Sequence, residues 1–251
     1  MDRIIYTAMG GAQRTLEQQS VISNNLANAS TDGFRRQMAI YRSVPVVSPD
    51  TLPTRVGTVT STPGSDFQQG AMRETGRSLD VAITGQGWFS VQTPSGEAYT
   101  RGGSFAVNAQ GLLVTVQGGL PVLGDNGRPI EVPDRGQVTF TSDGAVNALG
   151  AGDDPTEVQQ IGRLKLVDPP QSELRQGPDG LFRVGQGEGV PAQADPRVHV
   201  VSGFVEQSNV SPAQAMVGMI SNSRRFDMQM KVISDASSNE DQGNSILAPA
   251  K

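Results

Sequence analysis

The stretch "SNNLANASTDGFRR", Ser23–Arg36, closes what reads as an amphipathic helix at the start of the chain. Its asparagines Asn24, Asn25 and Asn28 are poor helix formers, and no charged residue occurs from Gln18 to Thr31. A surface helix of an isolated domain normally carries charged residues on its outward face. One interpretation places the amides in a contact with other chains, where they hydrogen-bond at less cost than an unpaired buried charge. Asparagines at an ordinary helix end, facing water, are the alternative.

The residues before this stretch predict a helix over 4–30, and Asp32-Gly33 supplies the turn that ends it. At about 100° per residue, the apolar side chains cover an arc of roughly 160°, which is wider than one packing seam requires. Alternating steps of four and three residues run through this arc as in a coiled coil. The members of this register are Ile5, Met9, Ala12, Leu16, Gln19, Ser23 and Leu26. The helix therefore has room for a partner in its own chain and for neighbouring copies.

A second helix is predicted at the other end of the chain. Ser211-Pro212-Ala213-Gln214 combines a capping serine, a proline at the first helical position and a glutamine three residues after the cap. Several large apolar residues then share one face, and methionines make this surface tolerant of different packing arrangements. These residues are Met216, Met219, Ile220, Phe226, Met230 and Ile233.

Between the helices the pattern changes to strands and turns. Residues 35–78 contain four prolines and read as an extended connector. Residues 79–205 show short alternating apolar runs separated by turn signals such as Asp125-Asn126-Gly127. The sequence therefore predicts an α+β fold in which a mostly antiparallel β domain is inserted between N- and C-terminal helical segments (1–34 and 206–251).

Composition excludes several classes of function. A net charge of −5 argues against a nucleic-acid binder. The absence of cysteine excludes disulfides and thiolate sites, and a lone histidine excludes a multi-histidine metal site within one chain. No apolar stretch approaches the roughly 20 residues that span a bilayer. The first residues lack the features of a secretory signal, so we expect any export to retain the N-terminus.

Candidate catalytic groups are weak. Gly85 and Gly87 resemble part of a dinucleotide loop, but strand-like residues follow where a helix should begin. His199 lies in the apolar run "VHVV", and Glu131 with Asp134 forms a carboxylate pair whose spatial separation the sequence does not give. The acidic pairs Asp153-Asp154 and Glu240-Asp241 lack the pattern of a calcium loop. We expect no catalytic residue, metal or cofactor.

Three motifs in fixed order resemble the bacterial flagellar rod and hook axial proteins. Near the N-terminus the family signature is matched by Ser23–Phe34, and near the C-terminus by "SNV" (Ser208–Val210) and "MISNSRRFDMQMKVIS" (Met219–Ser234). The middle signature is matched by "LDVAITGQGWFSV" (Leu79–Val91), "YTRGGSF" (Tyr99–Phe105) and "GLLVT" (Gly111–Thr115). Trp88 stands where the family commonly has phenylalanine. Together the motifs span nearly the whole chain.

The resemblance implies a structural subunit of the flagellar rod, most similar to subunits of the proximal rod, which crosses the periplasm. It also implies that the N- and C-terminal helices pair as a coiled coil around a central export channel. It implies contacts with other copies and with proximal and distal rod proteins, export by the flagellar type III apparatus, and contacts with the surrounding rings. The implied assembly interface adds Phe34 to the helix residues named above. A distal rod or hook subunit is the related alternative, and a periplasmic cell-wall-acting enzyme built on residues 79–205 is the alternative from another class.

Overall fold

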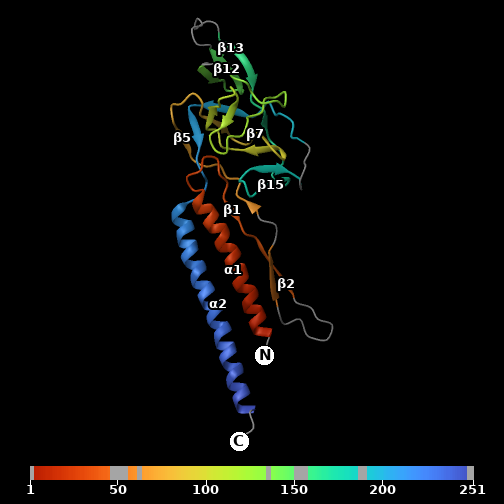
Figure 1. Cartoon of the computed structure of the whole chain (residues 1–251), viewed down its shortest axis with the longest axis vertical. Helices are drawn as coiled ribbons and strands as arrows, with labels where there is room; N and C mark the ends of the chain where they lie inside the picture. The colour runs from red at the N-terminus through yellow and green to blue at the C-terminus, as the bar shows by residue number, and fades with distance from the viewer. Residues whose placement is uncertain are drawn as a thin grey trace. The chain divides into compact units, whose positions relative to one another are not determined.

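The computed structural model describes residues 3–45, 56–60, 64–133, 137–149, 158–185 and 191–247. The chain divides into two compact units: residues 1–27, 37–64 and 211–251 form unit 1, and residues 28–36 and 65–210 form unit 2 (Figure 1). The expected α+β fold is confirmed, because a helix lies near each end and the described strands of the inserted β body pair antiparallel. The residues expected to form a connector, 35–78, are shared between the units.

Unit 1 contains the two helices, α1 (Arg3–Ala27) and α2 (Pro212–Leu247). They lie side by side and antiparallel (Figure 1). The start of α2 follows from the local sequence, since the Ser211 hydroxyl accepts a hydrogen bond from the Gln214 amide at 3.4 Å and Pro212 needs no amide partner.

A β-hairpin accompanies α1 in unit 1. It follows β1 (Gln37–Met38) and pairs β2 (Tyr41–Pro45) with β3 (Val56–Thr60), with Tyr41 opposite Thr60. The Tyr41 hydroxyl donates to the carbonyl oxygen of Arg14 at 3.0 Å, which ties the hairpin to α1. Of the four prolines in the expected connector, Pro45 ends β2, and the other three lie outside the described residues. The short strand β4 (Gly64–Ser65) marks the passage to unit 2.

Unit 2 is built from short antiparallel strands. Five of them form a sheet in the order β14-β7-β8-β16-β15, and β11-β12-β13 form another. The remaining pairs are β9 with β10, β6 with β17 and β5 with β18. Their bounds are β5 (Met72–Glu74), β6 (Val81–Thr84), β7 (Trp88–Thr93), β8 (Gly96–Thr100), β9 (Phe105–Val107), β10 (Leu113–Thr115), β11 (Gln137–Phe140), β12 (Ala145–Leu149), β13 (Gln159–Arg163), β14 (Leu166–Val167), β15 (Leu174–Gln176), β16 (Phe182–Val184), β17 (His199–Ser202) and β18 (Phe204–Glu206).

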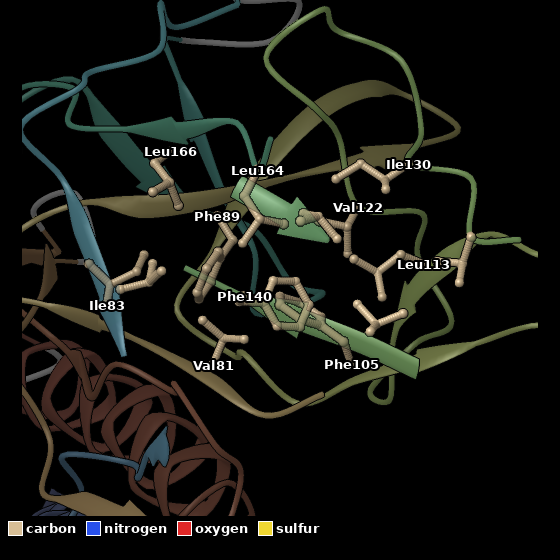
Figure 2. Close-up of a cluster of buried hydrophobic side chains, with 14 of the residues drawn as sticks. Val81, Ile83, Phe89, Phe105, Leu113, Val122, Ile130, Phe140, Leu164 and Leu166 are labelled. Carbon is tan, nitrogen blue, oxygen red and sulfur yellow. The ribbon is translucent and has the colours of Figure 1, made fainter. Parts of the chain in front are cut away.

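The main core of unit 2 gathers inward side chains from many of these strands (Figure 2). Phe89 and Phe105 lie edge to face with ring centroids 5.3 Å apart, and Phe140 lies 6.1 Å from Phe105. Such aromatic contacts add specificity to the burial of apolar surface. A second cluster surrounds Trp88 and Tyr99.

Two glycines allow distant segments of unit 2 to approach closely. A β-carbon on Gly103 would lie 1.6 Å from the carbonyl oxygen of Val81. Gly33 has φ of 75°, and a β-carbon there would lie 2.2 Å from the amide nitrogen of Gly102. The turn after α1 and the "YTRGGSF" segment therefore pack backbone against backbone, which only glycine permits.

Candidate assembly interface

One face of α1 is exposed to solvent and carries no charge. Tyr6, Met9 and Leu16 are 65%, 53% and 56% exposed, although each side chain is large and apolar. The same face continues in steps of three and four residues through the exposed polar residues Gln13, Ser20 and Ser23. An apolar stripe of this spacing is typical of a helix that packs on another helix.

A different face of α1 contacts α2 through small and polar side chains. Asn222 of α2 donates to the carbonyl oxygen of Thr15 at 2.8 Å and to the side-chain oxygen of Gln19 at 2.9 Å. Thr15 also donates to Gln229 at 3.1 Å, and Gly11 leaves room for that glutamine. Sequence reasoning missed Asn222 and Gln229; the small residues at Gly10-Gly11-Ala12 were the available signal, because they permit close approach of helices.

The residues expected at the assembly interface therefore divide by exposure. Met9, Leu16, Ser23, Asn24, Met216, Ile220 and Met230 are exposed; Ile5, Gln19, Leu26, Asn28, Met219, Phe226 and Ile233 are half-buried; Ala12, Asn25 and Phe34 are buried. The exposed set on α2 also includes Val217, Met228 and Val232, which are 67%, 61% and 47% exposed. Both helices thus keep apolar surface that their own chain does not cover in the described structure.

The asparagines of the opening stretch are used in different ways. Asn25 is buried, and its side chain exchanges two hydrogen bonds of 2.8 Å with the backbone amide and carbonyl of Gln37. The Asn25 side chain thereby bonds to the Gln37 backbone as a neighbouring strand would, and it holds the chain segment after the turn in place. The side-chain oxygen of Asn28 accepts a hydrogen bond of 3.2 Å from the Thr31 hydroxyl, and its carbonyl oxygen accepts one of 3.2 Å from the Thr31 amide. These two bonds form the turn. Asn24 is exposed.

Unit 2 holds a buried ionic cluster that the sequence did not reveal. Both carboxylate oxygens of Glu206 are paired: one with Arg35 at 2.5 Å, the other with Arg101 at 2.6 Å. Arg101 also donates to the carbonyl oxygens of Gly87 at 2.7 Å and Gly85 at 2.8 Å. Arg101 lies within the "YTRGGSF" motif, Arg35 directly follows the N-terminal motif, and Glu206 lies two residues before "SNV".

Burial governs the electrostatics of this cluster. Removal from water lowers the pKa of Arg35 and of Arg101, and the Glu206 carboxylate opposes that lowering in both. The guanidinium carbon of Arg35 also lies 5.9 Å from the centre of the Trp88 ring. Arg35 precedes β1, Arg101 follows β8 and Glu206 ends β18, so the cluster fastens three segments of unit 2 together.

The described residues show no arrangement suited to catalysis. Gly85 and Gly87 have positive φ in the turn before β7, and Gly87 packs against Val198. His199 is exposed on β17 opposite Thr84, and Glu131 is exposed. Asp134, Asp153 and Asp154 lie outside the described residues. Across the ranges of the chain that the structure describes, no group of acidic or histidine side chains is placed to hold a metal, and neither helix has the length and apolarity to cross a membrane.

Comparison with protein families identifies the class of protein. Residues 5–35 match the family described as flagella basal body rod protein, and residues 201–246 match the C-terminal region of flagellar basal body rod FlgEFG proteins. Residues 82–148 match the D1 domain of flagellar hook protein FlgE/F/G. The chain belongs to this family of flagellar basal-body rod proteins, so the resemblance drawn from the motifs is confirmed.

Individual relatives extend the match over the whole chain. The flagellar basal-body rod proteins FlgF of Escherichia coli K12 and Salmonella typhimurium LT2 are 48% and 47% identical over 253 residues, which cover 99% of this chain and of each relative. FlgG of Buchnera aphidicola from Acyrthosiphon pisum is 32% identical and covers 86% of this chain. The chain is therefore a structural subunit of the basal-body rod and not an enzyme, and its place is the rod that crosses the periplasm.

Proposed function

We propose that the chain polymerises through α1 and α2, which pair as a coiled coil within each subunit and interlock with the helices of other copies and of proximal and distal rod proteins. The observation that carries this proposal is the uncharged, exposed face of α1 defined by Tyr6, Met9 and Leu16. A lone helical hairpin gains nothing by exposing such side chains, whereas a neighbouring helix removes them from water.

The proposed task is mechanical. Torque applied at one end of the rod passes through contacts between subunits, so stiffness depends on how many helices interlock. Helices arranged around the rod axis would also surround the channel through which later subunits pass. Delivery by the flagellar type III export apparatus and contact with the surrounding rings complete the proposed set of partners.

The exposed residues expected at the interface form its centre. Met9 and Leu16 on α1 and Ile220 on α2 supply apolar contact, while Ser23 and Asn24 supply uncharged polar groups. Uncharged groups cost less to bury between helices than unpaired charges, and they disfavour wrong registers.

The test is Leu16→Asp. Because Leu16 is 56% exposed, the change costs the isolated subunit little, but it places a carboxylate in the helix contact. Val116→Asp is the matched control, since Val116 is 53% exposed in unit 2. We expect the Leu16 variant to be exported but absent from purified basal bodies, and the Val116 variant to be incorporated. Leu26→Asp should act in the same direction, although Leu26 is half-buried. Normal rods and swimming with Leu16→Asp would contradict the proposal.

A further inference from the structure

Charge is unevenly distributed along α2. Its basic residues, Arg224, Arg225 and Lys231, precede its acidic residues Asp235, Glu240 and Asp241, with Asp227 as the one acidic residue among the basic ones. None of these side chains forms an ion pair in the part of the chain that the structure describes. Asp227 and Asp235 lie one helical turn from Lys231 and support it locally. Glu240 and Asp241 have no basic residue within that distance.

The arginine pair borders an apolar hollow on α2. Val217, Ile220 and Met228 line it together with Arg224 and Arg225, and it measures about 320 Å³. Val217, Ile220 and Met228 are more than half exposed. The hollow faces away from α1, because α1 packs against the side of α2 that carries Asn222 and Gln229.

The acidic pair lies near the end of α2. Ile22 of α1 contacts Gly218 of α2, and Gly11 contacts Gln229, so the two helices keep one antiparallel register along their contact. If this register continues, the described part of α1 begins at a level before Glu240 of α2. Figure 1 shows the end of α2 extending past the start of α1. Glu240 and Asp241 therefore sit on a helix end that α1 does not cover within the described residues.

The two pairs are related by one fixed displacement. Arg224 to Glu240 and Arg225 to Asp241 are both steps of 16 residues. In an α-helix this step corresponds to about 24 Å along the axis and about 160° around it. The basic and acidic pairs therefore lie on nearly opposite sides of α2, so a parallel helix shifted by that length presents its acidic pair to the basic pair.

We propose that the hollow on α2 receives the acidic end of α2 from a second copy of this chain, displaced by about 24 Å along the helix. Arg224 and Arg225 then pair with Glu240 and Asp241 of the neighbour, and the apolar hollow accommodates its helix. A two-fold packing, with the basic side of one α2 against the basic side of another, sets arginine against arginine, which like-charge repulsion disfavours. The contact is head-to-tail, so each copy offers both halves and the series continues. This inference rests on the proposed function and adds the registry of the helices.

Cysteine cross-linking tests the displacement, because the natural chain has no cysteine. Ser221 and Ser237 are exposed and separated by the same 16 residues. We expect Ser221→Cys/Ser237→Cys subunits in isolated basal bodies to form a ladder of disulfide-linked multimers on oxidation. Each single-cysteine variant should form no ladder, because each then lacks one half of the contact. A variant that enters basal bodies but forms no ladder overturns the registry alone, whereas normal rods built from Leu16→Asp subunits overturn the proposed function.

Charge exchange provides an independent test on the purified full-length chain. Arg224→Glu/Arg225→Glu should weaken self-association at low salt at least tenfold, and adding Glu240→Arg/Asp241→Arg should restore it. Asp227→Arg/Asp235→Arg is the matched control, because it changes the charge of α2 by the same amount at positions that are not 16 residues from the arginines. Added to the first variant, it should restore no self-association. Equal rescue by both pairs, or no weakening in the first variant with helix content unchanged, would overturn the proposal.

Discussion

Arg101 and Glu206 are separated by 105 residues in sequence, yet their side chains meet at 2.6 Å in the interior of unit 2. Both side chains are almost completely buried, with exposures of 1% and 0%. Arg35 completes the cluster from the other side of the same carboxylate. The segments that carry these residues are therefore held to one another by charge as well as by apolar packing.

Removing the shared carboxylate should strongly destabilise unit 2. Glu206→Gln leaves two buried guanidinium groups without a counter-charge, for which we expect a loss of about 3–5 kcal/mol in the free energy of unfolding. The fluorescence of the single tryptophan, Trp88, during urea unfolding reports on this unit. Glu131→Gln, on an exposed residue, is the control and should change the free energy by less than about 0.5 kcal/mol. A similar midpoint for both variants would show that the cluster contributes little.

Gly103 should not tolerate a side chain. The β-carbon of Gly103→Ala would meet the carbonyl oxygen of Val81, and backbone cannot move aside as a flexible side chain does. We expect a loss of about 3 kcal/mol or more in unit 2, measured by thermal unfolding. Gly127→Ala is the control that measures backbone strain without a steric clash, because Gly127 has φ of 73° and no atom lies within 4 Å of the position of an added β-carbon. That control should cost only about 1–2 kcal/mol.

Tyr99 should titrate at unusually high pH. Burial raises the pKa of its phenol to about 12, although the hydrogen bond from the Ala192 amide opposes the rise. The neutral form is thus favoured in the folded state, so its stabilising contribution is complete below pH 10 and is lost as pH rises from about 10 to about 12. Absorbance of tyrosinate should show a transition near pH 12 that disappears in Tyr99→Phe. A transition of Tyr99 near pH 10 in the folded protein would contradict this expectation.

The helices of unit 1 should be less protected than unit 2 before assembly. α1 and α2 expose apolar side chains and bury few large ones, whereas Phe89 and Phe105 are fully buried in unit 2. In hydrogen exchange on the isolated full-length chain, we expect faster exchange over residues 4–30 than over β7, with the difference reduced in assembled rods. Equal protection in a verified monomer would indicate that the helices need no neighbours.

Local sequence was sufficient for the features that short-range chemistry determines. The periodicity of residues 4–30 predicted α1, and Ser211-Pro212 predicted the start of α2, because capping and helix geometry involve residues within one or two turns. Alternation and turn residues predicted the antiparallel body, and the ordered motifs predicted the family. The width of the apolar arc on α1 also follows from spacing alone, but which part of it stays exposed does not.

Tertiary structure decided which partner each polar side chain meets. Asn25 reads as an interface residue in sequence, but the fold brings the backbone of Gln37 to its amide. Arg35, Arg101 and Glu206 read as ordinary surface charges, because arginine and glutamate are mostly exposed. Their burial depends on the path of the chain, which brings together residues far apart in sequence. Spacing gives the direction in which a side chain points along its own helix or strand, but only the assembled fold determines what lies there.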